Sequence, residues 1–133
     1  MICLDTTFLV HLWRNRQDSS HPSIQLLIHN PAEIFAVPVV AAGEFLEGAA
    51  FISPSRLKEA MTFLTLFEVG TASLETAQHY AQIVADLRHR KLLSGVSKAD
   101  LWIAAWTVEH QAKLATQNTR HFQNVRELQL ISY

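Results

Sequence analysis

Residues 1–14 of the chain, MICLDTTFLVHLWR, join a short apolar run to a single acid and then to apolar residues at helical spacing. The run Met1–Leu4 is typical of a buried parallel strand, and it ends at Asp5. Thr6 suits the N-cap of a helix that continues to about Arg16. This segment therefore predicts a buried strand, an acidic turn and a helix, in that order.

The same alternation of strand and helix continues along the rest of the chain. Ile34–Val37 is predicted to form a second strand, and Lys113–Thr116 and Leu128–Ile131 are predicted to form two late ones. No hairpin signal such as Asn-Gly is present, so the pattern predicts an α/β fold with a mainly parallel sheet. No linker or repeat interrupts it, which favours a single domain over residues 1–133. After the first helix, further helices are expected at about Ile24–Ile28, Pro38–Phe51, Ser53–Leu66, Ser73–Lys91 and Ser97–His110.

Composition excludes several classes of protein. The chain has four Gly, four Pro, 17 % charged and 49 % hydrophobic residues, which excludes a disordered or collagen-like chain. Its longest apolar stretches, Phe35–Gly43 and Leu101–Trp106, are far shorter than the roughly 20 residues that cross a bilayer. The single cysteine, Cys3, excludes an internal disulfide and a cysteine-rich zinc site. We expect a globular protein of the cytoplasm that does not bind a membrane.

Two further acids stand almost alone in apolar helical segments. Glu44 and Glu47 are the only ionisable residues between Val37 and Ile52, so this helix is predicted to be mostly buried. A buried carboxylate is costly unless a cation meets it, which favours a functional role for Glu44 and leaves Glu47 as a solvated side chain. Asp100 repeats the pattern near the start of a later apolar helix.

Each of these acids also has an ordinary structural explanation. Asp5 would cap the first helix, and Asp100 lies three residues after Ser97, which is the spacing of a capping box. Glu44 would reach solvent or pair with an arginine. The role of the acids therefore depends on whether they meet in space.

The carboxyl end of the sheet is where these side chains are predicted to converge, because ligands bind there in parallel α/β folds. Two carboxylates about 4 Å apart repel by about 4 kcal/mol at an effective dielectric constant near 20, so a divalent cation or a shared proton must compensate. Oxygen donors without His or Cys select Mg²⁺ or Mn²⁺, which suits hydrolysis of a phosphodiester. Thr116 and Asn118 follow a predicted strand at the same edge, although a plain turn would use the same residues.

At these residues the sequence resembles the PIN-domain family, in particular the VapC-type toxin ribonucleases of toxin–antitoxin pairs. The resemblance implies a three-layer α/β/α sandwich with a mainly parallel central sheet. It departs from the family at one point, because many relatives carry a fourth acid where this chain has Asn118 or, three residues later, His121. The motifs that carry the resemblance follow one another along nearly the whole chain: Leu4–Thr7, Glu44–Ala49, Asp100–Ala105 and Leu114–Phe122.

The resemblance also implies a function, namely metal-dependent endonucleolytic cleavage of RNA with Mg²⁺ or Mn²⁺ at the three acids. It implies a homodimer that a small VapB-type antitoxin inhibits. Asn118 would act as a further catalytic group, as a ligand or by ordering a water. The hydroxyls of Thr6 and Thr116 would support the site by holding a phosphate or a water.

RNA is expected to lie along a local basic patch. The net charge of −1 argues against an affinity for nucleic acid over the whole surface. Basic residues late in a helix also favour the helix dipole, which offers a second reason for their position. The predicted RNA-binding residues are Arg88, Arg90, Lys91, Lys98 and Arg120.

Two other functions stay open. One is a catalytically weakened PIN-like interaction module, for which Asn118 in place of an acid is the argument. The other is a receiver-type phosphoacceptor domain, but Asp5 is followed by Thr6-Thr7 rather than by a second acid, and no Lys occurs after Lys113. A metal titration separates the enzyme from the module, since a pure binding module gains no stability from Mn²⁺.

Overall fold

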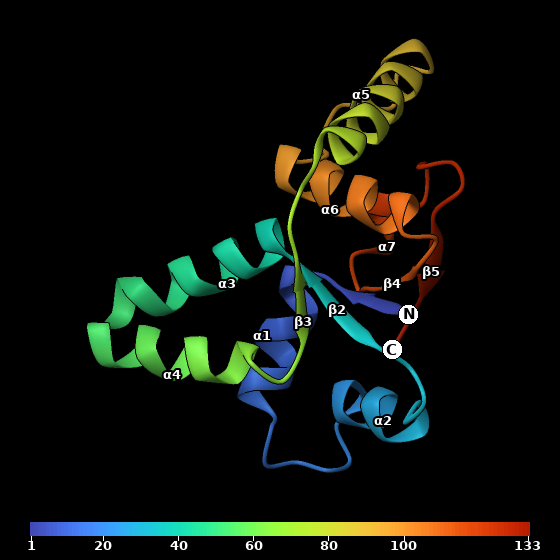
Figure 1. Ribbon diagram of the computed structural model, residues 1–133. Coiled ribbons are helices and arrows are strands. Elements are labelled where there is room, and N and C mark those ends of the chain that lie inside the picture. The colour runs from blue at the N-terminus through green and yellow to red at the C-terminus, as the bar shows by residue number, and fades with distance from the viewer.

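A single sheet of five parallel strands forms the centre of the computed structural model, which describes residues 1–133 (Figure 1). The strands are β1 (Ile2–Leu4), β2 (Phe35–Pro38), β3 (Glu68–Gly70), β4 (Lys113–Ala115) and β5 (Gln129–Ile131). They lie in the order β3-β2-β1-β4-β5. The central strand β1 is buried at every residue, as expected for a parallel strand that is covered on both faces.

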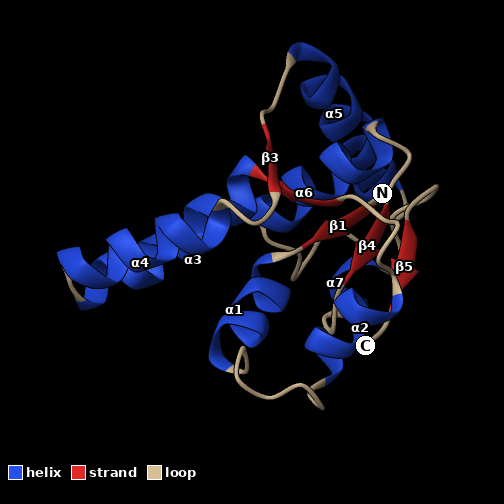
Figure 2. Cartoon of the chain, turned by 60° about the horizontal axis from the view of Figure 1, so that its bottom comes forward, coloured by secondary structure: helices blue, strands red, loops and turns tan.

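Helices cover both faces of the sheet and produce the predicted three layers (Figures 1 and 2). They are α1 (Thr6–Arg14), α2 (Pro22–His29), α3 (Val39–Ile52), α4 (Pro54–Leu64), α5 (Leu74–His89), α6 (Lys98–Glu109) and α7 (Thr119–Phe122). α1 and α2 pack on one face, whereas α5, α6 and α7 pack on the other. None of these helices combines the length and the apolar character that a membrane span requires.

The path of the chain reverses across the sheet at β1. From β1 the chain runs outward through β2 to β3, and it then crosses over to β4 and β5. The segments that leave β1 and β4 therefore turn to opposite faces, and this switch point is where α/β sheets bind ligands. Leu4 pairs with Ala115, so the residues that follow them, Asp5 and Thr116, lie side by side at the carboxyl edge.

Most of the predicted helix starts are confirmed by their capping hydrogen bonds. The hydroxyl of Ser53 accepts from the Arg56 amide at 3.0 Å, and Ser73 and Ser97 cap α5 and α6 in the same way. The first cap is different. Asp5 caps α1, and Thr6 is already the first helical residue, so the prediction of Thr6 as N-cap is wrong.

The prediction that the helix after the second strand is mostly buried is also wrong. α3 and α4 form an antiparallel hairpin that projects beyond the sheet (Figures 1 and 2), and α3 leaves Glu44, Glu47 and Gly48 exposed. Phe51, at the far end of the hairpin, is 92 % exposed. The helix buries one face only, which consists of Ala41, Ala42, Phe45 and Ala49.

A close approach of backbone to side chain joins the edge strand β3 to α6. The Cα of Gly70 lies against the indole of Trp106, so that a Cβ at this position would come within 2.1 Å of the Trp106 Cζ2 atom. The indole Nε1 donates to the Thr71 carbonyl at 3.2 Å, which holds the ring in place. Only glycine fits at residue 70 while Trp106 keeps this position.

Candidate active site

Asp5 lies at the centre of the predicted site, at the end of β1. Its side chain is buried, with the residue 2 % exposed, and its Oδ1 accepts from the Phe8 amide at 2.7 Å. This hydrogen bond is the ordinary capping role that the sequence also allowed. The cap uses Oδ1 of the carboxylate, and the Thr116 hydroxyl also hydrogen-bonds to this side chain.

The surroundings of Asp5 disfavour its charge. Burial is the main reason that the pKa of Asp5 rises from 3.8 to about 6, and the negative charges of Asp100 and Glu44 raise it further. The Thr116 hydroxyl and the Phe8 amide oppose the rise but do not cancel it. The three acids therefore share one electrostatic neighbourhood, and a cation there would relieve the cost of ionising Asp5.

Glu44 reaches this neighbourhood from α3, on the same side as α1. Its Oε1 accepts from the Thr6 hydroxyl at 2.5 Å, so the first turn of α1 holds the carboxylate beside Asp5. Glu44 is exposed and forms no ion pair with an arginine, in contrast to its alternative structural explanation. Thr6 thus positions an acid of the site.

Asp100 comes from the opposite helical layer, in the first turn of α6. Its backbone amide donates to the Ser97 hydroxyl at 3.1 Å, so half of the predicted capping box is present. Its carboxylate does not return to Ser97. Instead, Oδ2 accepts from His121 Nδ1 at 2.9 Å.

His121 is the one residue of the site that sequence reasoning did not select. The spacing of the chain's seven histidines matches no metal-ligand pattern, so it does not single out His121. The available signal was its place in the last motif, Leu114–Phe122, three residues after Asn118. The imidazole occupies that place and binds Asp100.

Asn118 and Thr116 shape the loop beside Asp5 in different ways. Asn118 donates from Nδ2 to the Thr7 hydroxyl at 3.0 Å, and its amide donates to the Thr116 hydroxyl at 2.9 Å. Thr116 is fully buried, and its expected contact with a phosphate or a water stays a prediction. Its hydroxyl faces Asp5, where it stabilises the carboxylate.

The donor set fits a hard divalent cation, although the side chains do not form a closed cage. No group of three Asp, Glu, His or Cys side chains lies close enough to hold a metal ion in this arrangement. Glu44 and Asp100 are instead engaged by the Thr6 hydroxyl and the His121 imidazole. Both partners are side chains that can rotate away, and buried Asp5 gains most from a cation. Metal binding would therefore require Glu44 and Asp100 to exchange these hydrogen bonds for the ion.

The predicted RNA-binding residues differ in whether their cationic groups are already engaged by contacts within the chain. Arg90 donates to the Asp86 carboxylate and to the Asn124 carbonyl, so its guanidinium is engaged within the chain. The other four are exposed and take part in no ion pair: Arg88, Lys91, Lys98 and Arg120.

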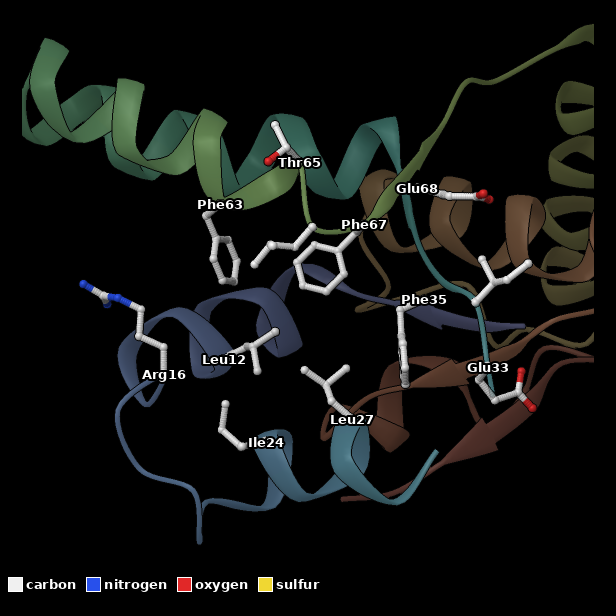
Figure 3. Close-up of a pocket in the computed structure, with 12 residues that line it drawn as sticks. Leu12, Arg16, Ile24, Leu27, Glu33, Phe35, Phe63, Thr65, Phe67 and Glu68 are labelled. Atoms are coloured by element: carbon white, nitrogen blue, oxygen red, sulfur yellow. The ribbon is translucent and has the colours of Figure 1, made fainter. Parts of the chain in front are cut away.

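An apolar groove of about 630 Å³ lies away from the acids, between α1, α2 and the end of α4. Figure 3 shows apolar side chains such as Leu12, Leu27 and Phe67 between Arg16 on one side and two glutamates, Glu33 and Glu68, on the other. The groove has no carboxylate cluster or nucleophile. It is suited to binding an apolar segment and not to chemistry.

Comparison with known proteins gives consistent results. A family model described as the PIN domain matches residues 2–128. The chain is 29 % identical over 99 residues to Ribonuclease VapC1 of Methanocaldococcus jannaschii, covering 74 % of this chain and 69 % of that protein. It is 26 % identical over 130 residues to Ribonuclease VapC2 of Rickettsia felis, covering 94 % and 92 %. The crystal structure of VapBC2 from Rickettsia felis, bound to a promoter DNA fragment, is similar with a TM-score of 0.83 at 23 % identity, covering 100 % of this chain and 99 % of that one.

Proposed function

The chain belongs to the PIN-domain family, and from this premise we propose that it is a VapC-type endoribonuclease, the toxin of a toxin–antitoxin pair. It hydrolyses RNA phosphodiester bonds with Mg²⁺ or Mn²⁺. The observation that carries the proposal is the placement of Asp5, with Glu44 and Asp100 near it, at the switch point of the sheet. Two curated relatives of the chain are named as ribonucleases, which supports the reaction class.

The chain's own residues divide the work between holding the ion and placing the substrate. Asp5 and Asp100 would hold the cation, and Glu44 would complete its surroundings or orient the attacking water. When bound there, such an ion would make a water more acidic and offset charge on the phosphate. Thr6 and His121 hold Glu44 and Asp100 in the ion-free protein, and Asn118 fixes the loop after β4 by its contact with Thr7.

Metal ions are expected to control both activity and stability. Purified protein should cut structured RNA with Mg²⁺ or Mn²⁺, and EDTA or Asp100→Asn should abolish the cutting. Mn²⁺ at about 100 times its dissociation constant should stabilise the fold by about 2.7 kcal/mol, measured by thermal unfolding. Equal cutting in every tube would indicate a contaminating nuclease. An unchanged unfolding temperature together with no cutting would favour the interaction module.

We propose that the partner is a VapB-type antitoxin and that the apolar groove is its binding site. Solved structures similar to this chain are VapBC and toxin–antitoxin complexes, which supports a partner of this kind. The groove is apolar along its length and has opposite charges at its two ends, so it suits a segment with an apolar face and charged flanks. A homodimer and a cytoplasmic location remain predictions.

The substitution Leu66→Glu tests this proposed binding site without disturbing the core. Leu66 lines the groove and is 73 % exposed, so a carboxylate there should leave folding and RNA cleavage unchanged. Coexpressed VapB-type antitoxin should then fail to relieve toxicity or to copurify. Leu74→Glu is the matched control, because Leu74 is 88 % exposed and lies on α5, away from the groove. Equal loss of the antitoxin in both variants would exclude the groove as the binding site.

A further inference from the structure

A second, polar hollow adjoins the acids on the side of His121. It has a volume of about 450 Å³ and lies between the loop after α5 and the segment that follows β4. Small-molecule sites commonly measure roughly 300–1,000 Å³. Most of its lining is polar, and the side chains that matter for its chemistry are Gln117, Asn118, Arg120 and His121.

The hollow presents a defined set of hydrogen-bonding groups. Arg120 is exposed and takes part in none of the ion pairs, so its guanidinium is free to donate. Gln117 donates from Nε2 to the Tyr133 carbonyl at 3.4 Å, and Asn118 donates from Nδ2 to Thr7. Each amide thereby uses one of its two N–H donors within the chain, and its oxygen accepts no hydrogen bond from the chain. The hollow therefore offers one cationic donor fork and two neutral amides whose oxygens are free to accept.

This set matches guanine better than the other three bases of RNA. Guanine carries two acceptors, O6 and N7, that a guanidinium binds in a bidentate manner. Its Watson–Crick edge also carries two donors, N1–H and the N2 amino group, which suit two amide oxygens. Adenine has an amino group where guanine has O6, and uracil has no adjacent pair of acceptors for the arginine fork. Cytosine offers N3 and O2 to the fork, but it carries only one donor group, its N4 amino group, for the two amide oxygens.

The position of the hollow relates it to the scissile bond. His121 lines it and is bound through Nδ1 to Asp100, so the ring stands between the hollow and the acids. Aromatic side chains of this kind stack on unpaired RNA bases. We propose that the hollow, here termed the base hollow, receives a guanine base of single-stranded RNA next to the phosphate that is cleaved. This proposal rests on the proposed ribonuclease function.

Binding of short RNAs to an inactive protein tests the proposal. In the Asp5→Asn background, fluorescence anisotropy is measured with labelled UUGUU, UUAUU, UUCUU and UUUUU. We expect UUGUU to bind about tenfold more tightly than the other three, since a bidentate contact to a base discriminates by about that much. Gln117→Leu changes no charge, so it should reduce the preference for guanine and leave the affinity for UUUUU unchanged. Arg120→Met should reduce the preference further and also weaken binding of every RNA.

Two controls separate the possible failures. Lys58→Met removes an exposed cation on α4 that is not part of the hollow, and it should keep the preference for guanine. Equal affinity for all four RNAs, or a preference that survives both Gln117→Leu and Arg120→Met, would overturn the base hollow alone. Absence of RNA binding together with absence of cleavage by the unsubstituted protein would overturn the ribonuclease function as well. Loss of antitoxin binding without loss of guanine preference in the Arg120 variant would assign the hollow to the partner protein.

Discussion

Replacing Asp5 by asparagine is expected to abolish RNA cleavage and, at the same time, to make the metal-free protein more stable. Asparagine caps a helix as well as aspartate does, so the hydrogen bond from the Phe8 amide can persist. The variant lacks the charge that would hold the cation, and we expect activity to fall at least about 100-fold. Stability should increase because the buried charge, which lies near Glu44 and Asp100, disappears.

The gain in stability should depend on pH in a defined direction. Because the pKa of Asp5 is about 6 in the folded chain and 3.8 as a reference, the folded state keeps a proton between these values that the unfolded state has released. The free energy of unfolding therefore falls as the pH rises from about 4 to about 6 and stays low above it. At pH 7, Asp5→Asn should recover up to about 3 kcal/mol.

Urea denaturation at pH 4 and pH 7 with EDTA measures the gain in stability of Asp5→Asn. A cleavage assay with RNA and Mn²⁺ measures the loss of activity. Glu59→Gln is the matched control, because Glu59 is an exposed acid on α4 and its loss should change stability by less than about 0.5 kcal/mol. A variant at Asp5 that cuts RNA normally would remove this acid from the site. A variant that is less stable at pH 7 would show that the carboxylate stabilises the fold.

The second large effect is expected at Gly70, where alanine should destabilise the fold by about 3 kcal/mol. The added Cβ would lie within 2.1 Å of Trp106 Cζ2 and 2.5 Å of Cε2, and the rigid indole is buried on α6. Either the edge strand β3 or the indole must shift. A shift of the indole would also break its hydrogen bond to the Thr71 carbonyl.

The denaturation midpoints of four variants isolate this contact: Gly70→Ala, Gly43→Ala, Trp106→Phe and the double variant Gly70→Ala/Trp106→Phe. Gly43→Ala is the control, since a Cβ at this helical position meets nothing within 4 Å and should stabilise α3 by about 0.5–1 kcal/mol. In a Trp106→Phe background the smaller ring should make Gly70→Ala cost clearly less than in the unsubstituted chain. Equal costs in the two backgrounds would contradict the contact as the cause.

Local sequence signals predicted most of the fold. Helix starts at Ser53, Ser73 and Ser97 were predictable because a hydroxyl that accepts from the next turn is a local interaction. The parallel sheet followed from alternating strands and helices without hairpin signals. The same order of elements indicated that Asp5 and Asp100 belong to one edge.

The missed features depend on tertiary packing. The strand β3 was not predicted, because two of its three residues are exposed and it shows no hydrophobic pattern. Its extended conformation is stabilised by pairing with β2. The hairpin of α3 and α4 exposes apolar residues that a partner or a second copy would be expected to cover, and composition alone therefore overestimated its burial. The hydrogen bond between Asp100 and His121 joins residues that are 21 positions apart, on α6 and α7. It depends on how these two helices pack, which local spacing does not predict.

The acids reach Asp5 from the two helical layers, Glu44 on α3 from the side of α1 and Asp100 on α6 from the other. An ion bound between these acids would cross-link the two helical layers. Its affinity would then depend on how well the packing of the layers keeps the carboxylates in place. Substitutions that weaken the packing between the layers, even far from the carboxylates, should therefore lower the affinity for the ion before they unfold the chain.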